Sequence, residues 1–167
     1  LGLLNVGPES AGAQPGPACY GFGGRQPTVT DADLILGYIN SEHFLGDDMT
    51  LNVELAERAI RDTLCASLQM DTVEVAWSIH RVVNENMVNA ARIYMAEKGR
   101  DPKRYHLVAF GGAGPIHAYW LAKRLGIGKV LVPPKAGVTS AVGFLVTPLS
   151  FDYVRTYLTR ISDIDLN

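Results

Sequence analysis

Apolar residues recur at helical spacing over two consecutive segments of the chain. The first runs from about Val53 to Gln69, and Asn52 is placed to cap its first turn. The second runs from about Thr72 to Lys98 and carries a wide apolar stripe formed by Ile79, Val82, Val83, Met87, Ala90, Ala91 and Tyr94. The pattern predicts two helices, and the width of the second stripe predicts a buried, central helix.

Polar residues mark the ends of these helices and the start of a shorter one. Asp71 and Glu74 form a plausible capping box for the long helix, and Gly99 is suited to end it. Earlier in the chain, a polar turn leads into an apolar run from Leu34 to Ile39. Asp31 or Thr30 could cap a short helix there.

Beyond Tyr105 the pattern changes to strands. Leu107 to Phe110 reads as a buried strand, and Lys129 to Val132 reads as a second one. Between them lies a helical run that Pro115 opens and Gly126 ends. A short helix rich in small residues follows from Gly137 to Gly143. This order of helices and strands predicts an α/β fold with parallel strands.

A glycine cluster separates the first strand from its helix. Gly111, Gly112 and Gly114 let backbone come close to a ligand, and the free N–H groups of the helix start favour an anion or a polar edge. A dinucleotide fingerprint does not fit, because the third glycine position counted from Gly112 is His117. A phosphate loop of the G-x-x-x-x-G-K-[ST] type is absent. A nucleotide site and a tight packing turn without ligand both remain open.

Composition narrows the class of protein. The 167 residues, 47% hydrophobic and 19% charged, suit one globular domain with a proper core. A net charge of −2 argues against nucleic-acid or anionic-membrane binding driven by charge. No apolar stretch is long enough to span a bilayer. Two cysteines are too few for a disulfide framework, which predicts a reducing, cytoplasmic location.

The two ends of the chain differ from its body. Residues 1–27 are rich in glycine and proline and predict an ordered irregular loop ahead of a helical and α/β body, residues 28–167. A flexible linker is the alternative, but Tyr20 and Phe22 are unusual in linkers. The chain opens without methionine and stops without a helix stop, so we expect a single partial domain from a longer polypeptide.

Three acidic or hydroxyl side chains are candidates for chemistry. Asp31 is the best candidate acid. An exposed aspartate between a pair of threonines and a second acid, Asp33, could position a water, a metal-bound water or a substrate amide. A simple helix cap is an equal alternative for it. Glu9 and Ser10 lie in the glycine-rich loop and could line the substrate side.

Cysteine and histidine give weaker signals. Cys19 has no histidine close in sequence to act as its base, which favours a buried structural thiol. His117 could touch a nucleotide or simply pack. The remaining histidines and the asparagines of the long helix show no metal-ligand spacing, so no metal site is predicted; they are His43, His80, His106, Asn84, Asn86 and Asn89.

The strand, the glycine turn and the small-residue helix together resemble the adenosine half of the actin-like ATPase superfamily. Four longer motifs resemble the hydantoinase A/5-oxoprolinase family, which includes the ATP-binding subunits of acetone and acetophenone carboxylases. They are GPESAGAQPGPACYG (Gly7 to Gly21), PTVTDADLILG (Pro27 to Gly37), LVAFGGAGPIHA (Leu107 to Ala118) and VPPKAGVTSAVG (Val132 to Gly143). Their order and number are more specific than any single turn.

The resemblance implies a part of an actin-like, ribonuclease H-like fold that binds ATP with Mg²⁺. It implies that Gly111, Gly112, Ala113 and Gly114 contact the adenosine. Members phosphorylate an enolate or amide oxygen, either to hydrolyse a cyclic amide such as a hydantoin or 5-oxoproline, or to carboxylate a ketone. A partner subunit of the hydantoinase B type and an oligomeric assembly are also implied.

One departure from the family pattern matters for activity. The phosphate-binding aspartate–glycine segments of the family precede the GPESAGA segment, and this sequence contains no D-x-G-G-T. We therefore expect the chain to supply the adenosine side of an ATP site and to be inactive alone, with catalysis in the parent protein. A non-catalytic module that binds a partner subunit is the alternative.

Overall fold

The computed structural model describes residues 4–46 and 48–160. The first three and last seven residues, from which a partial domain is expected, lie outside the described residues. The N-terminal loop is irregular apart from a short 3₁₀ turn. The elements in order are η1 (Ala18–Tyr20), α1 (Val29–Ile35), α2 (Val53–Ile60), the π turn η2 (Arg61–Cys65), α3 (Ala66–Leu68), α4 (Thr72–Glu97), η3 (Pro102–Arg104), β1 (Leu107–Val108), α5 (Gly114–Leu125), β2 (Val130–Leu131), η4 (Ala136–Val138) and α6 (Thr139–Val146).

The two predicted helices form at the predicted places. Asn52 caps α2, its side chain accepting a hydrogen bond from the Leu55 N–H. Asp71 and Glu74 form the predicted capping box of α4. The first of the two helices is interrupted by the π turn η2, which periodicity could not reveal.

The short helix α1 begins earlier than predicted. Thr28 is its cap, so the prediction that Asp31 or Thr30 caps a helix over Leu34 to Ile39 is wrong. Thr28 Oγ1 accepts a hydrogen bond from the Asp31 N–H, and the Asp31 carboxylate accepts one from the Thr28 N–H. The reason is that threonine and aspartate three residues apart make a reciprocal capping box.

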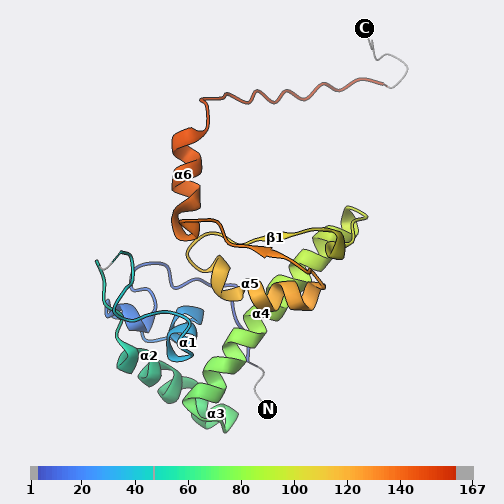
Figure 1. The fold of residues 1–167 in the computed structure, drawn as a ribbon. Helices are drawn as coiled ribbons and strands as arrows, with labels where there is room; N and C mark the ends of the chain where they lie inside the picture. The colour runs from blue at the N-terminus through green and yellow to red at the C-terminus, as the bar shows by residue number, and fades with distance from the viewer. Residues whose placement is uncertain (1–3, 47, 161–167) are drawn as a thin grey trace.

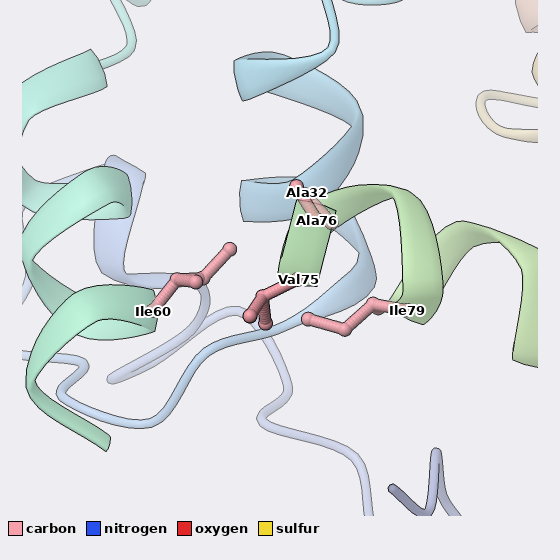
Figure 2. Packing of buried hydrophobic residues seen from close by; sticks show 5 residues of the cluster. All are labelled: Ala32, Ile60, Val75, Ala76 and Ile79. Carbon is pink, nitrogen blue, oxygen red and sulfur yellow. The ribbon is translucent and has the colours of Figure 1, made fainter. Parts of the chain in front are cut away.

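The core lies where α1, α2 and the first half of α4 meet. Figure 2 shows the buried residues that fill it, Ala32, Ile60, Val75, Ala76 and Ile79. Alanines at the contacts let the helices approach closely, and burial of each branched side chain contributes about 1.5–3 kcal/mol. The prediction that α4 is buried holds as far as Val88, which is fully buried, but not for the last turns, because Tyr94 is 60% exposed.

The strands pair in parallel, as the order of elements predicts. Leu107 lies opposite Val130 and Val108 opposite Leu131, with α5 as the connection. The prediction of a fully buried strand is wrong in part: Ala109 is buried, but Val108 and Phe110 are each 50% exposed. Two strands alone cannot cover the apolar faces that a parallel sheet normally buries.

Figure 1 shows how these parts are arranged. The helices α1, α2 and α3 gather around one end of α4, and the strand pair and α5 lie toward its other end. The helix α6 stands apart from this body, and its Phe144 and Leu145 are more than 80% exposed. Among the described residues, none of the helices is both long enough and apolar enough to cross a membrane.

Candidate functional site

The glycine turn between β1 and α5 is open to solvent. Gly111 has a φ of +87°, a backbone conformation that residues other than glycine rarely adopt. A Cβ atom added to Gly111, Gly112 or Gly114 would meet nothing within 4 Å. A packing turn needs glycine because a neighbour is close, and no neighbour in the described part of the chain is close here. The positive φ accounts for the glycine at position 111, and the nucleotide alternative stays a prediction.

A backbone hydrogen bond from the segment after β2 also holds the turn in place. The Gly111 N–H donates a 2.8 Å hydrogen bond to the Ala136 carbonyl, which joins the turn to the segment that opens the small-residue helix. The family motifs around Phe110 and Ala136 thus meet in space, although 25 residues separate Gly111 from Ala136. Beyond the turn, α5 begins at Gly114 without a side-chain cap. Pro115 has no N–H, and the Ile116 N–H donates to the Ala113 carbonyl, so the helix start offers few free donors.

Asp31 is buried, so the prediction of an exposed aspartate is wrong. Its Oδ1 accepts a hydrogen bond from Cys19 N at 2.8 Å, and its Oδ2 accepts from Ala18 N, Thr28 N and Thr28 Oγ1. Four donors from the loop and the helix start occupy both oxygens. This favours a structural role for Asp31 as the third-position partner in the capping box of Thr28, and the catalytic role stays an untested prediction.

Cys19 lies beside this carboxylate and is fully buried. Burial, reinforced by the charge of Asp31 and a hydrogen bond to it, raises the pKa of the thiol far above its ordinary value. A thiol held protonated is a poor nucleophile. The structural role predicted for this cysteine agrees with its surroundings.

Glu9 and Ser10 line an open groove of about 1050 Å³ between the N-terminal loop and α4. Thr28 and Thr30 line it from α1 and its cap, and Asn86 lines it from α4, where its Nδ2 donates to the Val6 carbonyl. The groove is large enough for a small molecule. None of the glycine-turn residues is among those that line it.

Three residues from three helices meet in a buried polar cluster. His80 Nδ1 of α4 lies 2.7 Å from Asp33 Oδ1 of α1, and His117 Nε2 of α5 lies 3.6 Å from Asp33 Oδ2. His117 Nδ1 donates to Asn84 Oδ1 at 3.1 Å. Burial raises the pKa of the Asp33 carboxyl, more than the hydrogen bond with His80 lowers it, and burial lowers the pKa of His117.

This cluster is not evident from the sequence. His80, His117 and Asn84 lie far apart or lack metal-ligand spacing, and Asp33 reads only as a second acid beside Asp31. One signal was available: His80 and Asn84 are four residues apart and so share a face of the predicted helix. Asp33 and His117 could not be added to that face, because only the packing of α1 and α5 on α4 brings them there.

Comparison with known proteins places these observations in a family. The hydantoinase/oxoprolinase family model matches residues 1–153. The acetophenone carboxylase gamma subunit of Aromatoleum aromaticum is 46% identical over 140 residues, which cover 84% of this chain and 19% of that protein. The caprolactamase subunit alpha of Pseudomonas jessenii is 40% identical over 163 residues, or 98% of this chain and 23% of that protein.

Solved structures agree with the sequence comparison. The ATP-dependent caprolactamase from Pseudomonas jessenii superposes with a TM-score of 0.77 at 42% identity, over 84% of this chain and 20% of that one. The chain thus spans about a fifth to a quarter of the length of these relatives. Its mixed helices and parallel strands are the α/β arrangement of part of an actin-like ATPase, and the chain belongs to the hydantoinase/oxoprolinase family.

Proposed function

We propose that this chain forms the adenosine side of the ATP site in an ATP-dependent cyclic-amide hydrolase. The observation that carries the proposal is the open glycine turn, where Gly111 to Gly114 leave room for a ligand and no packing neighbour explains the glycines. A relative described as an ATP-dependent caprolactamase supports ATP use on a cyclic amide.

The chemistry follows from the stability of an amide carbonyl. Phosphorylation of its oxygen by ATP releases ADP and activates the carbonyl carbon. Water adds at that carbon, the ring nitrogen leaves with a proton, and a second water hydrolyses the resulting acyl phosphate to the open-chain acid and phosphate. Mg²⁺ supplies charge neutralisation on the phosphates when it is bound, through residues outside this chain. Within the chain, the turn would hold the adenosine, and the Gly114 N–H at the start of α5 would face a polar edge of the nucleotide. Glu9 and Ser10, in the groove beside α4, are the proposed substrate-side residues.

Binding of ATP to the full-length protein tests the turn. Gly112→Val places a branched side chain in the open space, and Gly112 does not have the positive φ that would make valine strained. We expect at least a tenfold loss of ATP affinity by calorimetric titration, about 1.4 kcal/mol. Gly128→Val is the matched control, since Gly128 is also exposed, has a permissive φ and has free space around it. Equal affinity in the folded Gly112→Val protein and the wild type would reject the assignment.

A ketone carboxylase is the second candidate, because the acetophenone carboxylase subunit is 46% identical. The two reactions differ in their co-substrate. Phosphate release stimulated by a lactam in the absence of bicarbonate supports the hydrolase, whereas release that requires both a ketone and bicarbonate supports the carboxylase. ATP-independent binding of a partner subunit, with no stimulated phosphate release, would support the non-catalytic module. A partner subunit is expected in the first two cases as well, since both relatives are named as subunits.

A further inference from the structure

The buried cluster of Asp33, His80 and His117 has the composition of a metal site. One potential ligand atom from each residue lies within 4.8 Å of the others. The side chains are 2%, 0% and 6% exposed, so water does not screen their interactions. Each side chain comes from a different helix, α1, α4 and α5 respectively. Any ion bound here would therefore join three elements of the fold.

The hydrogen bond to Asn84 determines which nitrogen of His117 carries the proton. A carbonyl oxygen can only accept, so His117 Nδ1 must donate to Asn84 Oδ1. In the neutral ring that burial favours, Nε2 then presents a lone pair. That lone pair lies 3.6 Å from Asp33 Oδ2, another acceptor. Two acceptors that face each other in a buried site repel unless a proton or a metal cation lies between them.

The distances suit an ion better than a direct hydrogen bond. A separation of 3.6 Å between His117 Nε2 and Asp33 Oδ2 is too long for a good hydrogen bond. Two ligands bonded at about 2.1 Å to one zinc ion lie roughly 3.0–3.4 Å apart. His80 Nδ1 and Asp33 Oδ1, now 2.7 Å apart, would separate slightly. The three ligand atoms lie within 4.8 Å of one another, so binding one ion requires the side chains to adjust around it.

The ring of His80 is held in place by its neighbours. The rings of Tyr38, Trp77 and His117 lie 4.9, 5.6 and 5.1 Å from it. This packing keeps His80 Nδ1 directed at Asp33 Oδ1, 2.7 Å away. His80 Nε2 and Asn84 Nδ2, the buried side-chain polar atoms without a hydrogen-bond partner among the described residues, are not ligands in this arrangement and do not bear on the ion. The packed ring gives the cluster a preorganised ligand atom.

We propose that Asp33, His80 and His117 bind a divalent transition-metal ion, with zinc the ion that best fits two imidazoles and a carboxylate. His117 would bind through Nε2, oriented by Asn84 as an outer-shell partner. His80 would bind through Nδ1, and its ring proton would move to Nε2. Imidazole ligands favour zinc and its neighbours over Mg²⁺, so this ion is separate from any ion on the ATP phosphates.

The position of the site indicates what the ion does. His117 lies in the first turn of α5, three residues after Gly114, while His80 and Asp33 belong to the helices around the core. An ion bound to all three would fix the start of α5, and with it the glycine turn, against α1 and α4. The ion would thus be structural, and the inference does not depend on whether the turn binds ATP.

Metal content and cobalt spectroscopy of the full-length protein test the site. We expect purified protein to contain zinc at a stoichiometry that His117→Gln lowers by one equivalent. After chelation, added Co²⁺ should restore one equivalent, raise the melting temperature and give visible absorption bands typical of nitrogen and oxygen ligands. The control is His106→Gln, because His106 is exposed and lies outside the cluster; it should retain metal and spectrum.

X-ray absorption on the cobalt-loaded wild-type protein tests the site even if the variants do not fold. We expect scattering from two imidazole rings in the wild type and from one in His80→Gln or His117→Gln. If neither variant folds, two imidazoles in the wild-type spectrum still support the proposal and their absence overturns it. Folded wild-type protein that takes up neither Zn²⁺ nor Co²⁺, or that holds an equal amount of metal in a folded His117→Gln variant, would also overturn it.

Discussion

The backbone N–H of Cys19 donates a 2.8 Å hydrogen bond to Asp31 Oδ1 across 12 residues of sequence. This bond ties the N-terminal loop to the first turn of α1, and three further donors complete the carboxylate's partners. Asp31 therefore organises two segments at once. These hydrogen bonds explain how the loop around Cys19, which is rich in glycine and proline and forms no strand or long helix, is held against α1.

The first prediction concerns this carboxylate. Asp31→Asn replaces one acceptor oxygen with an NH₂ group that faces donors, so we expect a loss of about 2–4 kcal/mol in the free energy of unfolding. Urea denaturation checks it. Asp71→Asn is the matched control, because Asp71 is an exposed capping-box residue and asparagine caps helices equally well. An Asp31→Asn protein with full stability but no turnover would support the catalytic role instead.

The second prediction concerns the two thiols. Because the raised pKa keeps Cys19 protonated and the side chain is fully buried, iodoacetamide at pH 8 should leave it unlabelled in the native protein. Cys65 is only partly buried and should react first. Mass spectrometry of the two cysteine-containing peptides measures both rates. Equal native rates would contradict the packing described for η1 and α1.

The sign of the accompanying pH effect follows from the same shift. A thiol whose pKa is raised on folding stabilises the native state below its unfolded pKa, which is about 9. This contribution declines as the pH rises above that value, because only the unfolded chain then loses the proton. Cys19→Ala should therefore flatten the fall in stability between pH 8.5 and about 10.5. An unchanged slope would show that Cys19 does not contribute.

The third prediction concerns the core. Ile60→Ala removes a fully buried side chain from the contact of α1, α2 and α4 and should cost about 2–5 kcal/mol of unfolding free energy. Ile93→Ala is the control on α4, since Ile93 is 61% exposed. Its effect should stay within about 0.5 kcal/mol. Comparable losses for the two variants would mean that something outside the described residues covers the second half of α4.

The fourth prediction separates conformation from ligand binding in the glycine turn. Gly111→Ala forces a side chain into a φ of +87° and should cost about 1–2 kcal/mol of stability. Gly112→Ala should leave stability within about 0.5 kcal/mol, because its space is open and its φ is permissive. Thermal unfolding of both proteins without nucleotide is the measurement. Equal stability of the two variants would show that the turn adopts another conformation.

The sequence by itself determined the elements that depend on local physics. Helix periodicity, the Asn52 cap and the Asp71–Glu74 capping box defined α2 and α4, because caps and amphipathic faces act within a few residues. The glycine turn and the parallel strand pair were predicted for the same reason. The motifs also indicated the family, since their order is a property of the chain alone.

Only the tertiary structure decided the burial and the partners of individual side chains. Asp31 reads as an exposed acid in sequence, yet the N–H groups of Ala18 and Cys19 close over it. Asp33 and His80 lie 47 residues apart and meet because α1 packs on α4. Side chains from separate helices meet only when the helices pack together. That packing depends on long-range contacts, which a local sequence pattern does not reveal. The metal site proposed here is therefore a product of the fold.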